Sequence, residues 1–205
     1  PNEAGEYELL NGNQTGTLLV YYLLSRKKEL GLLTGKDFMV NTIVTTELIN
    51  KIAEGFGIPC YNVLTGFKNI ASIILQKEGK EKFLAGGEES FGFLVGDFVR
   101  DKDGVSACAL VAEVVAYYKT QGKNVFAVLA EVYQQFGFYK EALISVTKKG
   151  KDGAEQIQQL MNQSRKRCHL HHLMGHRLKQ VRPMKPEPLS WLKRCRLHRK
   201  RQGEG

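Results

Sequence analysis

The stretch Lys82-Phe83-Leu84-Ala85-Gly86-Gly87-Glu88-Glu89-Ser90-Phe91-Gly92 joins a short apolar strand to a glycine-rich, acidic loop. Glycines let the backbone take left-handed angles and let a ligand approach closely. If the backbone stays extended after the strand, alternation places Glu88 and Ser90 on one face and Glu89 on the other. A carboxylate accepts hydrogen bonds and a hydroxyl both donates and accepts, so this pair suits two neighbouring sugar hydroxyls. A tight turn with solvated acids is the alternative interpretation.

Strand and helix patterns alternate on both sides of this stretch. Runs of β-branched and apolar residues predict strands, and apolar residues three and four positions apart predict helices. Strand, helix, strand, helix, strand in succession predicts an α/β fold, with helices packed on a parallel or mixed sheet. The predicted strands span residues 37–45, 58–63, 82–86 and 139–147, and the predicted helices span residues 14–30, 47–54, 66–77, 104–119, 124–136 and about 152–163.

Two polar loops come directly after predicted strands, one at Thr65 and one at Glu88. In open sheets of this kind, ligands bind beyond the carboxyl ends of the strands. We therefore expect both loops to contribute to one ligand site. Thr65 is also placed to act as the N-cap of helix 66–77, and the two roles are compatible.

Charge is distributed unevenly along the 205 residues, whose formal net charge is +9. Residues 164–205 hold 13 Lys and Arg against 2 Asp and Glu, whereas the other 163 residues hold 17 against 19. All five histidines and Trp191 also fall in this basic segment. The remainder is nearly neutral, and its apolar and charged content is that of a globular protein.

Three segments are distinctive when taken together: Gly87-Glu88-Glu89-Ser90-Phe91-Gly92, then Arg100-Asp101-Lys102-Asp103-Gly104, and upstream Leu64-Thr65-Gly66-Phe67-Lys68. They resemble the corresponding segments of the alpha-D-phosphohexomutases, which comprise the phosphoglucomutases and phosphomannomutases. The similarity covers about residues 1–163. Three motifs in the family's order are far more specific than any one of them.

The resemblance implies a domain division as well as a fold. Residues 1–35 would be the end of the family's domain 2, and residues 36–163 its domain 3 with a following helix. Residues 164–205 resemble neither the next strand nor the phosphate-binding fourth domain. We therefore expect an unrelated, disordered basic tail there, and the hypothesis for its origin is an out-of-frame or misassembled end.

The resemblance also implies roles for five residues. Glu88 and Ser90 would bind vicinal hydroxyls of the sugar, and Thr65 with the Gly66 amide would hold a sugar or phosphate oxygen. Lys102 would neutralise the charge of the phosphate that is transferred. A solvated loop lysine is the alternative for Lys102.

The residues next to Lys102 are expected to have structural roles. We expect Arg100 and Asp103 to make structural contacts, and Gly104 to begin the helix that follows.

Two of the family's catalytic segments have no counterpart here. The Thr-Ala-Ser-His-type loop that carries the phosphoserine is absent, and so is the Asp-x-Asp-x-Asp-Arg metal loop. No catalytic or metal-binding residue is therefore assigned. By resemblance, Mg²⁺ and glucose 1,6-bisphosphate belong to the intact enzyme, while this fragment, lacking the other mutase domains, is expected to be inactive.

The expected activity of the parent enzyme is interconversion of sugar 1-phosphate and sugar 6-phosphate, with the Gly-Glu-Glu-Ser-Phe-Gly form favouring glucose. The partner is then a phosphosugar. No apolar run is long enough to span a membrane, and no basic-then-apolar leader opens the sequence, so we expect neither a membrane span nor a signal peptide. No disulfide framework is suggested, so we expect a cytoplasmic location. Cys60 and Cys108 lie in apolar contexts and are expected to be buried free thiols.

A rival function uses the basic tail. The run Lys193-Arg194-Cys195-Arg196-Leu197-His198-Arg199-Lys200-Arg201 could contact phosphates of a nucleic acid and release counterions. The alternative is thus a basic nucleic-acid-binding protein that acts through residues 164–205.

Overall fold

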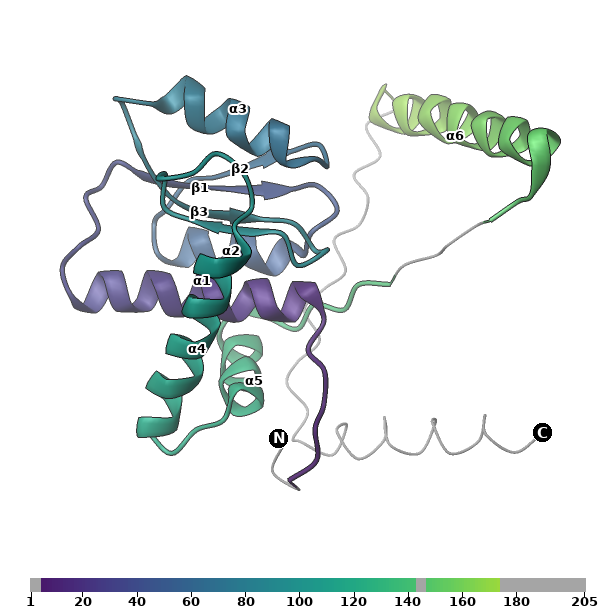
Figure 1. The fold of residues 1–205 in the computed structure, drawn as a ribbon. Helices are drawn as coiled ribbons and strands as arrows, with labels where there is room; N and C mark the ends of the chain where they lie inside the picture. Colours follow the sequence, from purple (N-terminus) through teal and green to yellow (C-terminus); the bar gives the residue numbers. More distant parts are fainter. Residues whose placement is uncertain (1–4, 143–146, 174–205) are drawn as a thin grey trace. The chain divides into compact units, whose positions relative to one another are not determined.

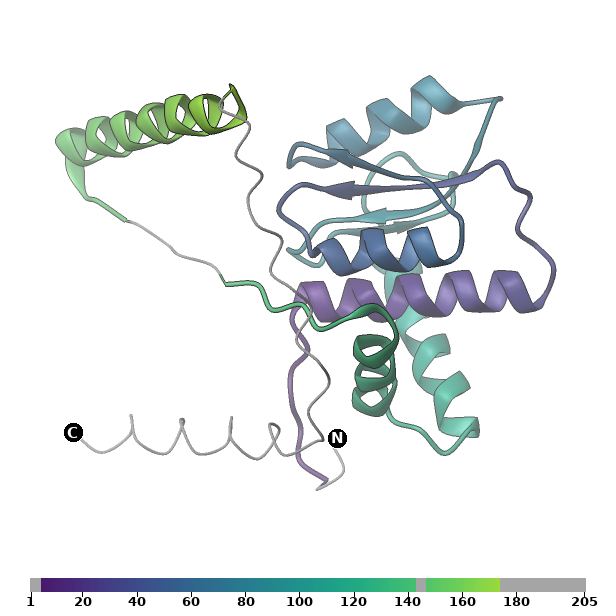
Figure 2. The same ribbon diagram turned by 180° about the vertical axis from the view of Figure 1, so that it is seen from behind.

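The computed structural model describes residues 5–142 and 147–173 (Figures 1 and 2). The chain to Lys140 forms one compact unit, and a second unit begins at Glu141. The first unit contains α1 (Gly12–Glu29), β1 (Asp37–Thr42), α2 (Glu47–Gly55), β2 (Cys60–Val63), α3 (Phe67–Lys77), β3 (Lys82–Gly87), β4 (Phe93–Val95), α4 (Gly104–Thr120) and α5 (Val125–Phe136). The second unit contains α6 (Gly150–Leu173).

The four strands form one mixed sheet in the order β2-β1-β3-β4. β1 pairs in parallel with both β2 and β3, and β4 runs antiparallel to β3. The connections through α2 and α3 are the crossovers that parallel neighbours require. The prediction of a mixed sheet with helices packed on it is confirmed.

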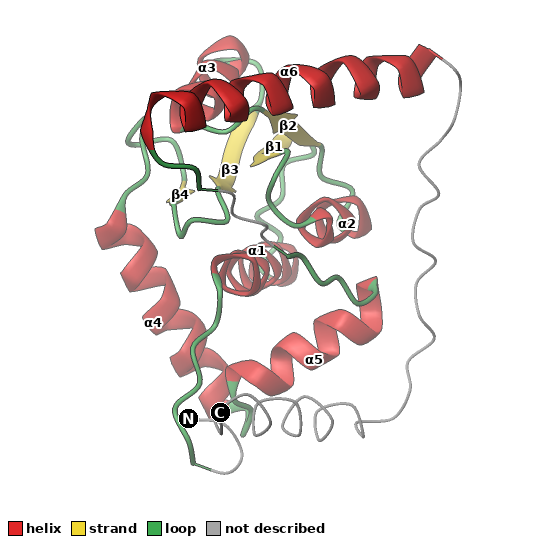
Figure 3. Cartoon of the chain, turned by 90° about the vertical axis from the view of Figure 1, so that its right-hand side faces the viewer, coloured by secondary structure: helices red, strands yellow, loops and turns green. Residues whose placement is uncertain are grey.

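Side chains that alternate along β1 divide the interior into two cores. Phe38 and Val40 face α3 and pack with Phe67 and Ile70, whereas Met39 faces the opposite side of the sheet. The larger core on that side takes its residues from α1, α2, α4 and α5. Helices thus cover both faces of the sheet, as Figure 3 shows for α3 on one side and α1 and α2 on the other.

The helices begin where polar side chains satisfy their first free amides. Asn11 forms a capping box with Gln14 at the start of α1. Thr46 caps α2 through the Leu48 amide at 3.2 Å. Asn124 caps α5. These caps keep the loops before the helices short and fixed.

Three expectations about secondary structure need correction or completion. β1 ends at Thr42, because the Thr45 amide turns back to the Thr42 carbonyl at 3.0 Å. Residues 139–142 and residue 147 form no strand, although Tyr139 packs on the larger core, and residues 143–146 lie outside the described ranges. α6 continues to Leu173 rather than ending near residue 163.

The expected division at residue 35 stays a prediction, although α1 and the sheet share one core. The rest of the basic tail, residues 174–205, lies outside the described ranges. Cys60 is partly buried, but Cys108 is exposed, so the expectation of burial is wrong for Cys108. α4 buries Leu110, Val114 and Tyr118 and leaves the side bearing Cys108 uncovered within the first unit. None of the described helices is both long and apolar enough to cross a bilayer.

Candidate functional site

Three loops leave the sheet at the carboxyl ends of its parallel strands. Residues 43–46 follow β1, residues 64–66 follow β2, and residues 88–92 join β3 to β4. The amino end of α1 lies against the same edge, since Asn13 Oδ1 accepts a hydrogen bond from the Thr46 amide at 3.0 Å. This is the edge where the sequence predicted a ligand site.

The β3–β4 loop is a tight turn. The Glu88 amide donates to the Gly92 carbonyl at 2.7 Å, and Phe91 takes a left-handed φ of 65°. The extended backbone assumed for residues 88–90 is therefore wrong, and with it the argument that placed Glu88 and Ser90 on one face. The cause is β4, which pairs antiparallel with β3 and forces the chain to reverse immediately after Gly87.

Glu88 is fixed by the loop that follows β2. Its Oε1 accepts a hydrogen bond from the Gly66 amide at 2.8 Å. The resemblance implied that this amide would hold a sugar or phosphate oxygen, but in the structure it is occupied by Glu88. Gly66 is the N-cap residue of α3, with φ 110° and no side-chain cap bond. A carboxylate at a helix amino end is favoured by the helix dipole. One oxygen of Glu88 is therefore held by the protein, and its second oxygen lies beside Gly92, 3.3 Å from where a Cβ of that residue would be.

Lys102 lies on the other side of Glu88. A Cβ added at Gly92 would lie 3.3 Å from Glu88 Oε2 and 3.3 Å from Lys102 Cδ, so both side chains border this glycine. Lys102 Nζ stands 5.4 Å from the centre of the Phe67 ring, a cation–π arrangement. Glu88, Gly66 and Lys102 thus come together at one place.

Ser90 and Thr65 border this place less closely. Both are exposed. Thr65 is not the N-cap that the sequence predicted. Asn69 Nδ2 instead donates to the Leu64 and Thr65 carbonyls, at 3.0 Å each, and holds the loop from inside the helix. The Thr65 hydroxyl has no hydrogen-bond partner among the described residues, and the same holds for Ser90.

Arg100 and Asp103 make the structural contacts that were expected. Arg100 pairs with Glu78 at 2.5 Å. Asp103 caps α4 by accepting from the Val105 and Ser106 amides, at 3.2 and 3.1 Å. Hydrogen bonds from Ser106, by its side chain and then its amide, hold the pKa of the Asp103 carboxyl below its ordinary value. The helix begins at Gly104, as predicted.

The residues that sequence reasoning missed are Thr45, Asn13 and Gly12. Glu89, the second acid of the motif, is bonded to Thr45 rather than turned to solvent. The run Thr42-Ile43-Val44-Thr45 lies at the end of the strand predicted over residues 37–45, and Thr46 precedes the predicted helix 47–54. Its three threonines within five residues were the available signal for a hydrogen-bonded turn.

Metal binding finds no support among these side chains. Within the described residues, no three His, Cys, Asp or Glu side chains lie close enough to hold one ion. The described residues therefore do not fit Mg²⁺.

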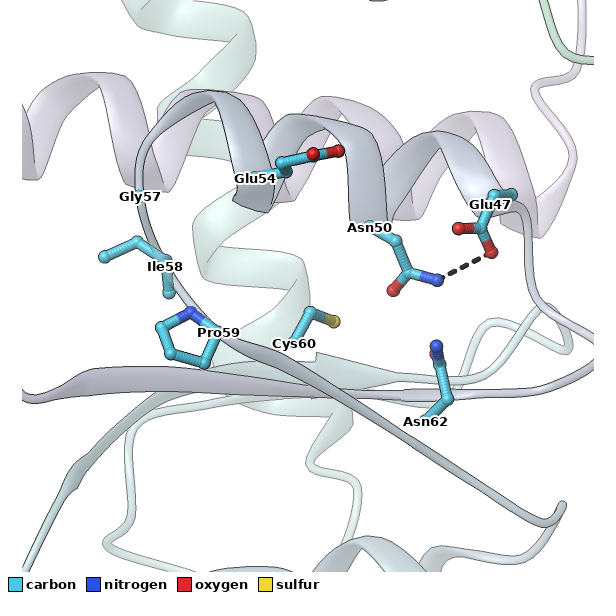
Figure 4. Close-up of a pocket in the computed structure, with 8 residues that line it drawn as sticks. All are labelled: Glu47, Asn50, Glu54, Gly57, Ile58, Pro59, Cys60 and Asn62. Carbon is cyan, nitrogen blue, oxygen red and sulfur yellow. Dashed lines mark hydrogen bonds between the residues drawn. The ribbon is translucent and has the colours of Figure 1, made fainter.

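A separate shallow pocket of about 420 Å³ lies between α2 and β2 (Figure 4). Glu47 and Asn50 of α2 are hydrogen-bonded to each other at 2.7 Å along its wall. Burial, and secondarily the charge of Glu47, raises the pKa of the Cys60 thiol to about 12, so the thiol is neutral and a poor nucleophile. This pocket includes none of the site residues that the sequence predicted.

Comparison with known proteins shows which protein family this chain belongs to. Residues 11–136 match the family model described as phosphoglucomutase/phosphomannomutase, alpha/beta/alpha domain III. The chain therefore belongs to the phosphoglucomutase/phosphomannomutase family.

Individual relatives agree. The chain is 33% identical over 162 residues to a phosphoglucomutase of Staphylococcus haemolyticus, covering 79% of this chain and 29% of that protein. It is 34% identical over 161 residues to a phosphoglucomutase of Staphylococcus aureus, covering 78% and 28%. A crystal structure from Thermus thermophilus, described as a phosphomannomutase, superposes with a TM-score of 0.51 at 25% identity, covering 68% and 30%. The chain thus spans less than a third of the length of each.

Proposed function

We propose that this chain carries the sugar-recognising loop of a phosphohexomutase that interconverts glucose 1-phosphate and glucose 6-phosphate. The observation that supports this most is the fixed carboxylate of Glu88, held by the Gly66 amide and bordered by Lys102. An oriented acceptor beside a cation suits a ligand that has both hydroxyls and a phosphate. Membership of the family narrows that ligand to a phosphosugar.

Each site residue has a distinct role in the proposal. Glu88 Oε2 accepts a hydrogen bond from a sugar hydroxyl, while Oε1 stays on the Gly66 amide. Ser90, at the exposed tip of the turn, binds the neighbouring hydroxyl. Thr65 holds a further sugar or phosphate oxygen, and Lys102 attracts the phosphate. Phosphoryl transfer depends mainly on such positioning and electrostatics.

The chemical step itself requires groups that these residues do not provide. We propose that a phosphoserine of the intact enzyme donates the phosphoryl group and that glucose 1,6-bisphosphate is the intermediate. We also propose that Mg²⁺ belongs to the intact enzyme, where residues outside this chain would hold it. This chain would contribute binding alone, so we expect a coupled glucose-6-phosphate dehydrogenase assay to detect no turnover of glucose 1-phosphate. Turnover by the pure chain would contradict that part of the proposal.

Binding is tested by titrating the ¹⁵N-labelled chain with glucose 1-phosphate and following amide resonances. Chemical-shift changes are expected at residues 64–67, 88–92 and 102, with weak affinity because one domain supplies only part of the cleft. Glu88→Ala should weaken the affinity by about tenfold or more, which is the loss expected for a charged hydrogen bond, and Ser90→Ala by about two- to tenfold, because its bond is between neutral groups. Ser72→Ala, on the exposed side of α3, is the matched control.

The same titration with mannose 1-phosphate tests the sugar preference. A dissociation constant lower for glucose 1-phosphate supports the glucose assignment, and equal or reversed constants reject it. Shifts that map outside residues 64–67, 88–92 and 102, or an affinity that is unchanged in Glu88→Ala, would overturn the proposed site.

A further inference from the structure

The geometry points to a lock, which is the pair of hydrogen bonds between Thr45, in the loop after β1, and Glu89, in the β3–β4 loop of residues 88–92. We propose that Thr45 and Glu89 are positioning residues, which hold the turn that presents Glu88 and Ser90. Glu89, despite its place in the acidic motif, would not contact the sugar. The consequence for sugar affinity rests on the proposed function, whereas the lock itself does not.

The Thr45 hydroxyl is the centre of this lock. Thr45 Oγ1 accepts a hydrogen bond from the Glu89 amide at 3.1 Å and donates one to Glu89 Oε2 at 3.3 Å. It also lies 2.7 Å from the Thr42 hydroxyl. A hydroxyl has one proton to donate and two lone pairs, so these three bonds use its full capacity when Thr42 is the donor. Thr45 therefore has nothing left to offer a ligand.

Rigid structure supports Thr45 on both sides. Thr42 is the last residue of β1 and is 1% exposed. Thr46 is 3% exposed, caps α2, and is tied by its amide to Asn13 of α1. Thr45 is therefore fixed between the end of a central strand and the starts of two helices. Its hydrogen bonds to Glu89 can in turn restrict the movement of the β3–β4 loop.

The amino end of α1 presses on the same turn. A Cβ at Gly12 would lie 1.7 Å from the Glu89 carbonyl oxygen and 3.1 Å from the Phe91 amide nitrogen. These distances mean that α1 packs backbone to backbone on the turn, which only glycine permits. The turn is thus held by its contacts with Gly12 and Thr45 and by the hydrogen bond from the Gly66 amide to Glu88.

These contacts explain how a turn with a strained backbone can persist. Phe91 holds a left-handed φ of 65° with its ring 64% exposed, so burial of that ring does not stabilise the conformation. Backbone strain persists when surrounding contacts determine the geometry. The contacts available here are those of Glu88 and Glu89, and they fix Ser90 between them.

The test compares Thr45→Val, which removes the hydroxyl at nearly constant shape, with Thr45→Ser, which keeps it. Amide hydrogen exchange of Glu89 and affinity for glucose 1-phosphate are measured by NMR. Thr45→Val should accelerate Glu89 exchange about tenfold and weaken the sugar phosphate by a similar factor, the value of one hydrogen bond. Thr45→Ser should keep the exchange rate of the Glu89 amide and the affinity for glucose 1-phosphate close to those of the parent chain. Thr120→Val is the control, since the Thr120 hydroxyl bonds only to the Tyr117 carbonyl.

The outcomes separate the lock from the sugar site. Unchanged Glu89 exchange in Thr45→Val overturns the lock, and faster exchange with unchanged affinity overturns its positioning role. If the parent chain binds no glucose 1-phosphate, the proposed function fails, whereas faster exchange in Thr45→Val that Thr45→Ser reverses still supports the lock. Retained affinity in Glu89→Gln, which keeps an acceptor for Thr45, supports positioning, and loss there as large as in Glu88→Ala overturns it.

Discussion

The Gly66 amide donates a hydrogen bond to Glu88 Oε1 across 2.8 Å and so joins the loops that follow β2 and β3. These two strands are not neighbours, because β1 lies between them in the sheet. A side chain at the end of one strand therefore reaches across a second to the start of a helix. The carboxylate gains a fixed direction, and the Gly66 amide gains an acceptor.

Replacing Glu88 should reveal how much this bond stabilises the fold. Glu88→Ala leaves the Gly66 amide without its partner and should lower the free energy of unfolding by about 1 kcal/mol. Glu88→Gln keeps a carbonyl acceptor and should cost less than half of that. Urea denaturation of both variants measures the difference, with Glu8→Ala in the exposed amino-terminal segment as the control. Equal losses in the Ala and Gln variants would contradict the role of the hydrogen bond.

The packing of α1 on the turn makes Gly12 sensitive to any side chain. Gly12→Ala places a methyl group 1.7 Å from the Glu89 carbonyl oxygen, so α1 or the turn must move, and we expect a loss of about 2–3 kcal/mol. Gly16→Ala in the same helix meets only the end of the Ile49 side chain at 3.4 Å. Higher helix propensity should make that change neutral or stabilising by up to about 1 kcal/mol.

Thermal unfolding of the two alanine variants is the measurement. A Gly12→Ala protein as stable as the parent would show that α1 does not contact the turn as described. Amide shifts of Glu89 and Phe91 in that variant report the displacement directly.

The framework around these loops could be predicted from the sequence because it depends on local signals. β-branched runs and helical spacing located α2, α3, α4, α5 and three of the four strands, with ends that differ by few residues from those in the structure. Asp103 as the structural residue before Gly104 followed from the position of the next helix. The antiparallel β4 was missed as a strand, because three residues carry too little pattern.

The sequence named some residues that the structure places together, but it did not give their geometry. The resemblance named Glu88 and Lys102, which lie together, but the direction of Ser90 was argued from extended backbone that the turn does not have. Thr65 satisfied every local rule for an N-cap, yet Asn69 holds that loop from within the helix. Neither a chain reversal set by β4 nor a bond between Thr45 and Glu89, 44 positions apart, has a signal in sequence spacing.

Lys102 provides a charge-specific prediction about the ligand. Lys102→Ala should weaken glucose 1-phosphate several-fold but leave the far weaker binding of glucose unchanged, because only the phosphate carries charge. The effect should shrink as salt is raised, since the side chain is 55% exposed and therefore screened. Lys80→Ala, another exposed lysine, is the control in the same NMR titration. An equal loss for glucose and glucose 1-phosphate would mean that Lys102 acts through packing on Phe67.

Tyr22 should make the protein less stable at alkaline pH. Its hydroxyl donates to Glu113 Oε1 at 2.6 Å between α1 and α4, and burial, followed by the bond to Glu113, raises its pKa from 10.0 to about 12. Above about pH 10 the unfolded chain releases this proton while the folded protein retains it, so stability is lost as the pH rises toward 12. Between about pH 9 and about pH 11 the loss from this group is about 1.3 kcal/mol.

Urea denaturation of the parent and of Tyr22→Phe at both pH values checks this dependence. Tyr22→Phe should be less stable by about 1 kcal/mol near neutral pH, because the bond to Glu113 is gone. Its stability should nevertheless fall less between the two alkaline pH values, since no proton is lost at position 22. Burial also raises the pKa of Tyr118. The Tyr22→Phe variant should therefore still lose stability as the pH rises, but less than the parent does. Parallel pH profiles for the two proteins would show that Tyr22 titrates alike in the folded and unfolded chains and would rule out the proposed linkage.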